Sequence, residues 1–572
     1  MPYASNHYPF ENKDRFQGDL FPADFIAEGL DQTRGWFYTL TVLGNKLFGV
    51  SPFRNCIVNG LVLAEDGKKM SKSLKNFPDP SHILDNYGSD ALRLYLINSP
   101  VVRGEPLRFN EAGVREVISR VLLPLWNSYR FFSEQAILFQ NTTGTAFIST
   151  SSANDKILNI TDRWILADCQ VSCGSWTKKW KITPTWYFFI HLSYIFPGYR
   201  LYTVVPRLLQ VIDNLTNWYI RFNRKRLKGA AGLGVGDTTA ALNTLFQVLF
   251  TVVRSMAPFT PFITEHIYGL LKPYISDFDE GRENTASVHF LPFPAVQEAL
   301  LDTVVERQMS AMQRVIRLAR TARERLGISL KSPLRSLVVI GDAQFLADVD
   351  RLRSYVAEEL NVRDIVLTDD EEEYGIHLKA KVDWPTLGKR LKKDVQVVRK
   401  ALPGLTQEAL RTYQREKHIV VQGIHLAEND LSIVWEMPVE KQNASSPTDG
   451  PTWEPSFDED VVVLLDGTSY PDLLEDGLAR DILTRFQKLR KKAGLVPLDD
   501  VRMQYSVLAN PEGVDVTTLI SSRQSMFTSS LRGKLEERSG ESGSDESLIE
   551  EDQALGNLVL RLRLAQVHTE LN

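Results

Sequence analysis

The sequence predicts an α/β protein with an all-α middle section. A short apolar run, Phe21–Ala27, is bounded by Pro22 and leads into Glu28-Gly29, which is the pattern of a buried strand. Residues 108–290 carry the apolar periodicity of helices. Apolar runs at Leu337–Ile340 and Ile365–Leu367, with helical periodicity between them, indicate strands of a further α/β unit. We therefore expect α/β units on both sides of a helical region.

Length and composition fit a multidomain protein. The 572 residues give room for roughly three or four domains of ordinary size. A hydrophobic content of 43% is enough to form their cores. The most apolar candidate for a membrane span, Ile182–Tyr199, is interrupted by prolines and a histidine, so we expect no membrane association. The first residues lack the basic and apolar regions of a secretion signal.

The cysteines indicate a reducing compartment. Cys56, Cys169 and Cys173 are too few and too poorly spaced for a zinc site or a disulfide framework. We therefore expect no bound zinc or other metal, and a reducing, cytoplasmic location.

The residues after the first strand combine an apolar face with polar side chains. Five apolar residues recur at helical spacing and are expected to line one face of a helix: Leu30, Trp36, Phe37, Leu40 and Leu43. This arrangement leaves Asp31, Gln32 and Arg34 for polar contacts. Gly29 has no side chain, so a ligand can approach its backbone closely.

A basic loop follows at Asp66–Ser73, opened by Asp66-Gly67. Lys68, Lys69 and Lys72 supply mobile ammonium groups that can follow a triphosphate as its geometry changes. Attack of a carboxylate on the α-phosphate of ATP needs this kind of positioning and charge stabilisation. The alternative is a solvated basic loop, which is the more common meaning of an isolated Lys-Ser run.

The order of these segments resembles that of the class I aminoacyl-tRNA synthetases. Lys69-Met70-Ser71-Lys72-Ser73 matches the KMSKS motif of that class, and Gly88–Tyr95 matches the segment that follows it. Glu28–Phe37 resembles the isoleucyl-tRNA synthetase version of the adenylate-binding strand and helix, which differs in the valine and leucine enzymes. The resemblance is to the eukaryotic cytoplasmic type, covers residues 1 to about 571 and weakens after residue 303.

This resemblance implies roles for individual residues. Lys69 and Lys72 would be the catalytic lysines. Further contacts to ATP and the adenylate would come from Met70, Ser71, Ser73, Glu28, Gly29 and Asp31. Gln32 would bind the carboxylate of the amino acid, and Trp36 would line the pocket for its side chain. The implied substrates are isoleucine, tRNA(Ile) and ATP with Mg²⁺, and a multi-aminoacyl-tRNA synthetase complex is the implied further partner.

One motif of the class is missing from these residues. Class I synthetases also carry an upstream HIGH tetrapeptide, and no His-x-Gly-His occurs in this sequence. The editing domain of the family precedes the motifs above, so we expect this chain to lack it. Two hypotheses follow: a ligase that joins isoleucine to tRNA(Ile), and a catalytically inactive fragment that binds only tRNA or synthetase partners.

A local basic cluster contrasts with the formal net charge of −5. Cations gather at the end of the apolar-periodic stretch Val204–Leu227, at Arg221, Arg224, Lys225, Arg226 and Lys228. Several phosphate contacts from such a helix end would give salt-dependent binding of tRNA. If exposed, Trp218 or Tyr219 could stack on an anticodon base. The alternative is that both rings are buried in the helix packing.

Changes of pattern along the chain indicate five segments. They are 1–107, the C-terminal part of the catalytic domain; 108–298, the helical anticodon-binding domain; 299–442, a junction and α/β unit; 443–456, a linker; and 457–572, an appended α/β unit. Thr303–Arg325 is expected to form a long helix, and Gly540–Glu551 an acidic flexible loop.

Two stretches of the helical segment stand out. Ala257–Glu265 is typical of isoleucyl and valyl enzymes, and its two prolines are expected to set a turn and a helix start. Residues 171–198 instead depart from the family pattern. Back-translation of Ser172–Lys181 in a shifted frame resembles the missing helix. We therefore hypothesise a gene-model artefact over 171–198, which a transcript sequenced across the region tests.

Overall fold

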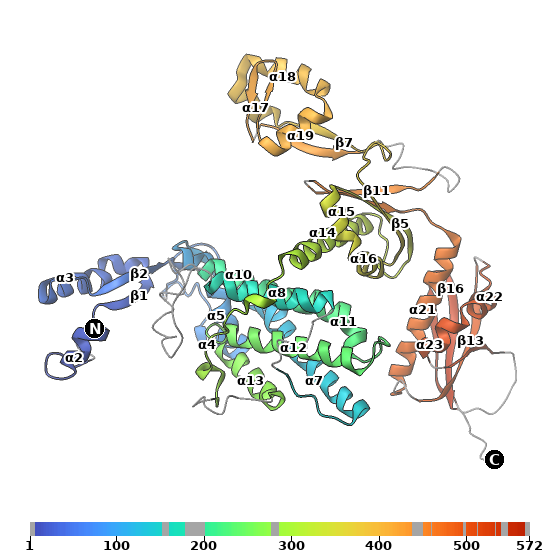
Figure 1. The fold of residues 1–572 in the computed structure, drawn as a ribbon, viewed down its shortest axis with the longest axis horizontal. Coiled ribbons are helices and arrows are strands. Elements are labelled where there is room, and N and C mark those ends of the chain that lie inside the picture. The colour runs from blue at the N-terminus through green and yellow to red at the C-terminus, as the bar shows by residue number, and fades with distance from the viewer. Residues whose placement is uncertain are drawn as a thin grey trace. The chain divides into compact units, whose positions relative to one another are not determined.

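The computed structural model of the protein describes most of the chain in two compact units, Met1–Glu306 and Arg307–Asn572 (Figure 1). The described residues are 6–71, 73–150, 159–177, 201–275, 285–428, 430–437, 450–458, 460–495, 499–511, 513–531, 533–538 and 547–566. Among their helices, none combines the length and the apolar character that a membrane span requires.

A parallel strand pair forms the first part of unit 1. β1 (Ala23–Gly29) pairs in parallel with β2 (Phe53–Asn59). α3 (Trp36–Phe48) makes the crossover connection that parallel strands require. Phe37 and Leu40 of this helix are buried against the strands. The predicted strand is confirmed, with both ends two residues further along the chain.

The predicted apolar face of the following helix is partly wrong. Leu30 lies in a separate 3₁₀ turn, Leu30–Arg34, and α3 begins only at Trp36. The side chains of Leu30 and Trp36 are 50% and 36% exposed. The extra turn changes the angular spacing between Leu30 and the helix, so the face that the sequence suggests as continuous is split in two.

Helices build most of the remainder of unit 1, as predicted. Two short helices, α4 (Pro80–Tyr87) and α5 (Ser89–Ile97), and one short parallel pair, β3 (Val62–Leu63) with β4 (Leu107–Arg108), lead into them. The helices that follow are α6 (Glu111–Val117), α7 (Leu123–Thr143), α8 (Ile160–Thr177), α10 (Leu201–Asp213), α11 (Ile220–Leu227), α12 (Val235–Met256) and α13 (Pro261–Leu271). α12 packs against α7, α8, α10, α11 and α13.

The stretch that carries the basic cluster is one continuous helix. A π-helical segment, Asn214–Tyr219, joins α10 to α11. Trp218 and Tyr219 lie on its inner side and are 9% and 0% exposed. The expectation that one of these rings stacks on an RNA base is therefore wrong, and the alternative of burial in the helix packing is correct.

The segment 171–198 is described only at its start. α8 continues through Thr177, so the first residues of this segment are helical. Residues 178–198 lie outside the described residues, and the hypothesis of a shifted reading frame stays a prediction. Further on, Pro261 is the first residue of α13, which confirms the predicted helix start.

The central sheet of unit 2 crosses the predicted linker. Its strand order is β11-β12-β5-β6. β5 (Leu334–Ile340) is parallel to β6 (Val362–Thr368) and antiparallel to β12 (Val462–Asp466). β11 (Trp453–Phe457) begins inside 443–456. The prediction of separate units at 299–442 and 457–572 is wrong, because strands from both share one sheet, and an apolar run does not reveal which strand it pairs with.

Three helices accompany this sheet. The predicted helix Thr303–Arg325 is confirmed as α14, and α15 (Ala343–Asp350) and α16 (Arg353–Leu360) connect β5 to β6. The buried Arg323 ties α14 to the segment before β5 and to the end of α16, since its guanidinium donates to the carbonyl oxygens of Ser329, Ser332 and Leu360.

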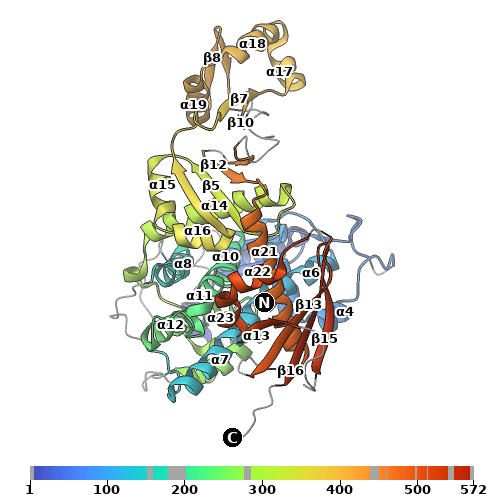
Figure 2. The same ribbon diagram turned by 90° about the vertical axis from the view of Figure 1, so that its right-hand side faces the viewer.

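A small lobe lies in the sequence between β6 and β11 (Figure 2). It contains α17 (Trp384–Leu391), α18 (Val395–Ala401) and α19 (Gln407–Glu416), with two antiparallel pairs: β7 (His377–Lys381) with β10 (Ser432–Glu436), and β8 (Ile419–Val421) with β9 (Ile424–Leu426). Its core includes Leu387, Val398, Leu402 and Tyr413.

The last part of unit 2 is a second four-stranded sheet packed on helices. Its strands, in the order β14-β13-β16-β15, are β14 (Leu535–Glu537), β13 (Val501–Ala509), β16 (Leu558–Gln566) and β15 (Ser547–Leu555). α21 (Pro471–Lys492), α22 (Val516–Ser522) and α23 (Gln524–Leu531) share its core.

The expectation of a flexible acidic loop is wrong where β15 begins. Residues 540–546 lie outside the described residues, but Ser547–Glu551 belong to the strand. The neighbouring strand β16 supplies the opposite charge, since Arg561 donates to Asp552 at 2.6 Å and lies 3.6 Å from Glu550. Cross-strand pairing of this kind stabilises an acidic strand that composition alone marks as disordered.

Cleavage inside the predicted linker tests the shared sheet. With a specific protease site placed at Ser445–Ser446, the two fragments of the cut chain are expected to co-elute in size-exclusion chromatography, because β12 is hydrogen-bonded to β5. The uncut chain is the control. Two separately eluting folded fragments in native buffer would contradict the sheet.

Candidate functional site

Two candidate segments follow the carboxyl ends of neighbouring parallel strands. Gly29, the last residue of β1, lies opposite Asn59, the last residue of β2. Leu30–Trp36 continues from the first strand, and the chain from the second passes through β3 into the loop Asp66–Ser73. Ligands of open α/β sheets bind outside the carboxyl ends of the strands. This edge is therefore the candidate site.

Gly60 directs the chain from β2 toward the loop. A Cβ on this residue would lie 1.8 Å from the carbonyl oxygen of Glu105, so no other residue fits there. The backbone N–H of Gly60 donates to the carbonyl oxygen of Val101 at 2.8 Å. Our reading of the sequence missed this glycine because the crossing segment is more than forty residues away in the chain.

Gly29 and Asp31 form a close pair at the end of β1. A Cβ on Gly29 would lie 2.7 Å from Oδ1 of Asp31, so the carboxylate is folded over bare backbone. The side chains of Glu28 and Asp31 are exposed. Two carboxylates at a strand end can accept hydrogen bonds from hydroxyl groups of a ligand.

Gln32 has a fixed orientation. Its Oε1 accepts a hydrogen bond of 2.9 Å from the backbone N–H of Trp36 at the start of α3, and its Nε2 donates to Oδ2 of Asp31 at 3.3 Å. The helix start thus holds the amide oxygen, while the amide nitrogen carries a second N–H. An oriented amide N–H is suited to donate to a carboxylate. The ring of Trp36 is part-exposed beside it.

The loop Asp66–Ser73 begins with a tight turn. Oδ1 of Asp66 accepts from the backbone N–H of Lys68 at 2.9 Å, and Gly67 has a φ of +80°, which favours glycine. The hydrogen bond from the Lys68 backbone and the nearby Lys68 ammonium lower the pKa of Asp66. Lys69 is exposed after this turn. Lys72 lies outside the described residues.

Asn76 holds the far side of the loop. Its Oδ1 accepts from the backbone N–H of Ser71 at 2.9 Å, and its Nδ2 donates to the carbonyl oxygen of Lys69 at 3.1 Å. The hydroxyls of Ser71 and Ser73 lie 2.7 Å apart. Met70 is half-buried between these contacts. Sequence reasoning missed Asn76, and an asparagine three residues after a Lys-Ser pair gave no signal of its own.

The segment after the loop is attached to the helical part of unit 1. The carboxylate of Asp90 in α5 is buried and accepts from the backbone N–H of Ile263, in the first turn of α13, at 2.7 Å. Arg93 donates to the carbonyl oxygens of Pro258 and Phe259 at 3.0 and 3.2 Å. Two sequence stretches that stand out separately, 88–95 and 257–265, therefore contact each other.

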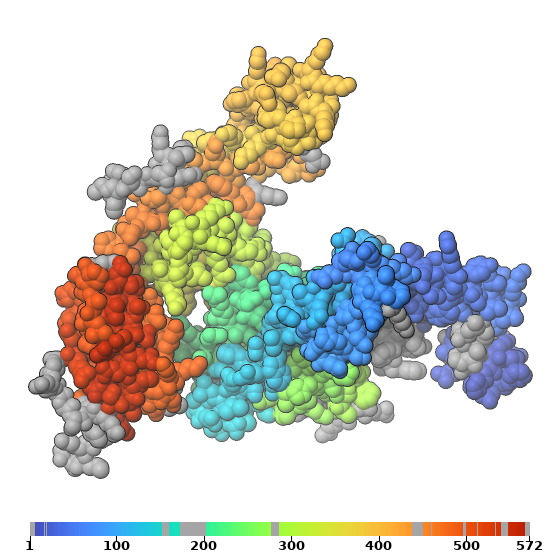
Figure 3. Space-filling view, turned by 180° about the vertical axis from the view of Figure 1, so that it is seen from behind, coloured from blue at the N-terminus to red at the C-terminus, as the bar shows by residue number. Residues whose placement is uncertain are grey.

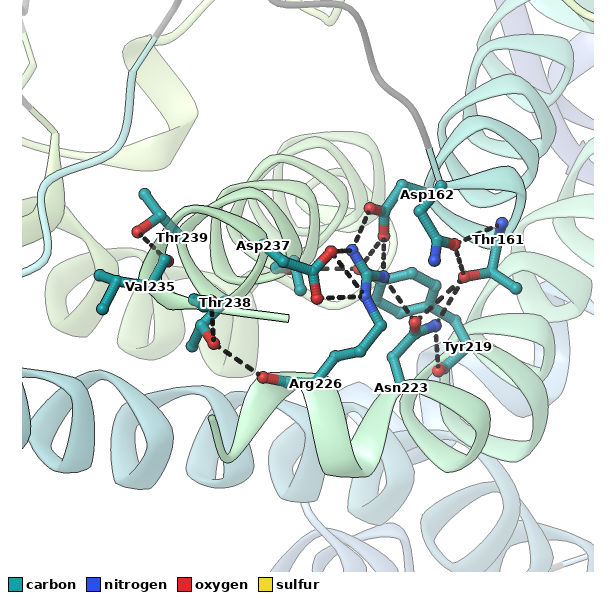
Figure 4. A network of polar contacts seen from close by, with 12 residues as sticks. Thr161, Asp162, Tyr219, Asn223, Arg226, Val235, Asp237, Thr238 and Thr239 are labelled. Atoms are coloured by element: carbon teal, nitrogen blue, oxygen red, sulfur yellow. Dashed lines mark hydrogen bonds and ion pairs between the residues drawn. The ribbon is translucent and has the colours of Figure 1, made fainter. Parts of the chain in front are cut away.

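The basic cluster contains one residue with a different environment. The guanidinium of Arg226 is buried between Asp162 of α8 and Asp237 of α12 (Figure 4). Its Nη2 lies 2.9 Å from Oδ2 of Asp162 and 2.7 Å from Oδ1 of Asp237. Tyr219 donates its hydroxyl to Asp162 at 2.7 Å. The expectation that Arg226 contacts RNA phosphate is therefore wrong, because its donors are used inside the bundle.

Electrostatics agree with a structural role for Arg226. Burial alone would lower the pKa of this group, but hydrogen bonds to Asp237 and Asp162 outweigh burial and raise it. Burial, followed by the charge of Asp162, raises the pKa of Tyr219. At neutral pH the network therefore holds a charged guanidinium and a neutral phenol.

The other four cations of the cluster face outward. Arg221, Arg224, Lys225 and Lys228 are exposed, and α11 carries them past the buried network. Within the described residues, no group of three or more His, Cys, Asp or Glu side chains could hold a metal ion.

Removal of one carboxylate tests the network. Asp162→Ala leaves part of a buried guanidinium unpaired, so the melting temperature of unit 1 is expected to fall by roughly 5–15 °C. The signal is the fluorescence of the buried Trp164 and Trp218. Asp213→Ala, at an exposed position of α10, is the control and is expected to shift the melt by about 2 °C or less. Equal melting temperatures for both variants would contradict the assignment.

Comparisons with known proteins agree on one family. Residues 1–108 match the family of class I tRNA synthetases for I, L, M and V, and residues 195–338 match the anticodon-binding domain of tRNA ligases. The second match runs past the predicted boundary at 298.

The curated relatives match almost the whole chain. A cytoplasmic isoleucine–tRNA ligase of Schizosaccharomyces pombe is 50% identical over 96% of this chain and 48% of its own length. The corresponding Saccharomyces cerevisiae protein is 46% identical over 99% of this chain and 50% of its own length, and that of Mus musculus is 44% identical over 99% and 43%. The chain thus spans about half the length of these relatives.

Proposed function

Because the chain belongs to the family of cytoplasmic isoleucine–tRNA ligases, we propose that it functions in the ATP-dependent activation of isoleucine and its transfer to tRNA(Ile). One observation carries the proposal: Leu30–Trp36 and the loop with Lys69 follow the carboxyl ends of two paired parallel strands. This arrangement supports a single site in which one segment binds the amino acid and the other binds the triphosphate.

In the first step of the proposed reaction, the isoleucine carboxylate attacks the α-phosphate of ATP and pyrophosphate leaves. The amide N–H of Gln32 would donate to this carboxylate, and the hydrogen bond that holds its oxygen at the start of α3 supports this role. Lys69 and Lys72 would stabilise the charge of the leaving pyrophosphate. MgATP enters as the substrate. The role of Lys72 rests on its place in the motif alone.

The remaining site residues fit the adenylate that this step produces. Glu28 and Asp31 would accept hydrogen bonds from the ribose hydroxyls, close to the bare backbone of Gly29. Ser71 and Ser73, together with Met70, would contact the nucleotide from the loop that Asn76 holds. The part-exposed ring of Trp36 would cover the aliphatic side chain of isoleucine.

In the second step, tRNA would bind the helical part of unit 1. Arg221, Arg224, Lys225 and Lys228 are the exposed cations that we propose for phosphate contacts. The names of the relatives favour the cytoplasm as the location of this reaction. We also propose the C-terminal sheet with α21 as the part that docks into a multi-synthetase complex, and the hydrophobic core that this sheet forms with its own helices supports this choice.

Isoleucine-dependent exchange of pyrophosphate into ATP tests the catalytic proposal. The purified chain is expected to catalyse exchange, and Lys69→Ala and Lys72→Ala are each expected to lower the rate about 100-fold, because each removes a charge that faces pyrophosphate in the transition state. Lys75→Asn is the matched control. Lys75 is exposed in the same loop with a φ of +47°, which asparagine tolerates, so exchange is expected to be unchanged.

No exchange by the unaltered chain would contradict the catalytic proposal. Binding of tRNA or of partner proteins would then be the remaining role. Exchange that survives in Lys69→Ala and Lys72→Ala would instead contradict the assignment of the loop.

Substitution of Gln32 tests the carboxylate contact separately. Glu at this position keeps an oxygen that can accept from the Trp36 backbone, but it lacks the amide N–H. The KM for isoleucine is therefore expected to rise roughly 10- to 150-fold, as for a lost hydrogen bond to a charged group. The KM for ATP is expected to change little. Thr33→Ala, which removes only a contact of 2.9 Å to the Leu30 carbonyl oxygen, is the control. Parallel rises in both KM values would point to a disturbed fold instead.

A further inference from the structure

One stretch of the small lobe of unit 2, Lys379–His418, carries a charge opposite to that of the whole chain. Between Lys379 and His418 there are eleven lysines and arginines against four aspartates and glutamates, whereas the chain has a formal net charge of −5. Neither the motifs of the sequence nor the proposed site accounts for this excess. The cations lie mainly on α17, α18 and the turn between them.

The cations of this helical hairpin fall into two groups. Arg390 of α17 pairs with Asp430, and outside the hairpin Lys379 of β7 pairs with Glu436 at 2.8 Å. A second group is exposed and forms no ion pair with any described residue: Lys389, Lys392, Lys393, Arg399 and Lys400. The single carboxylate among them, Asp394, is exposed as well. The hairpin therefore presents several free positive charges within twelve residues.

The apolar side of the hairpin is already used. Leu387 of α17 and Val398 of α18 are buried in the core of the lobe. The guanidinium of Arg399 lies 4.6 Å from the centroid of the Trp384 ring, and this contact holds the two helices together. A helix that binds a lipid surface exposes a wide apolar face, and this hairpin does not. The free charges therefore suit a hydrated polyanion better than a membrane.

We propose that this hairpin, which we call the 389–400 patch, is a second RNA-binding surface that contacts the phosphate backbone of tRNA. The proposal rests on the proposed function, since tRNA is the polyanion that function supplies. Lys389 lies in the last turn of α17, and Lys392 and Lys393 lie in the 3₁₀ turn that follows this helix, so three exposed ammonium groups within five residues can contact neighbouring phosphates. Figure 3 shows the outer surface of the lobe in yellow and light orange. Such contacts depend on salt and are independent of base sequence.

The test compares two triple variants of the full chain that remove the same charge. Lys389→Gln, Lys392→Gln and Lys393→Gln together remove charge from the patch. Lys331→Gln, Arg351→Gln and Lys534→Gln remove it from exposed, scattered positions of unit 2. Binding of a fluorescent tRNA(Ile) transcript is followed by anisotropy between 50 and 200 mM salt. Equal melting curves of the two variants verify that the lobe is folded.

Loss of three phosphate contacts lowers the salt slope by roughly two to three. When the salt concentration rises from 50 to 200 mM, the affinity of the scattered variant for tRNA is therefore expected to fall roughly 20- to 40-fold more than that of the patch variant. The patch variant loses less because it has fewer phosphate contacts that salt can weaken. The same salt slope and affinity in both variants would overturn the proposal. Polyglutamate serves as a second probe, and an equal loss of polyglutamate and tRNA binding in the patch variant would overturn the assignment to RNA.

Pyrophosphate exchange separates this proposal from the proposed function, because exchange needs no RNA. A chain without isoleucine-dependent exchange, whose patch variant still loses tRNA affinity, would refute the catalytic proposal and support the patch. A chain that catalyses exchange, but whose two triple variants bind tRNA equally, would support the catalytic proposal and refute the patch.

Discussion

The parallel pairing of β1 with β2 is the constraint on which the candidate site depends. Parallel strands direct both carboxyl ends to one edge, and the register that places Gly29 opposite Asn59 brings two segments together that are thirty residues apart. Local contacts then refine each segment. Gln32 is fixed by the start of α3, and the loop with Lys69 is held by Asp66 on one side and Asn76 on the other. Without the strand pair, the two segments would not lie at one site.

Buried charge connects this site to the helical part of unit 1. Asp90, in the second helix after the loop, accepts a hydrogen bond from the first turn of α13, and Arg226 joins α8, α11 and α12 through Asp162 and Asp237. A buried ion pair gains little over an apolar contact, but removal of one partner is costly. These contacts therefore fix how the helices meet. The same network orients the four exposed cations at α11, although none of the four is part of it.

The sequence allowed prediction of features that depend on local pattern. The first strand, the limits Thr303–Arg325 of α14 and the helix start at Pro261 all follow from apolar spacing or proline chemistry. The errors concern which residues and strands contact each other. A run of five lysines and arginines does not reveal that Arg226 faces two carboxylates, and a Pro- and Ser-rich stretch does not reveal that β12 completes the sheet of β5. Gly60 and the role of Asp90 were missed for the same reason, since only the fold brings Glu105 and Ile263 near them. Asn76 acts within its own loop, where its position gave no signal.

The central claim is that one ligand contacts both segments at the β1–β2 edge. Hydrogen–deuterium exchange of the chain with and without a non-hydrolysable isoleucyl-adenylate analogue tests it most directly. We expect slower exchange in peptides that cover residues 28–36 and in peptides that cover residues 62–76, with little change in the lobe around α17. Protection of only one of the two segments, or of neither, would contradict the account.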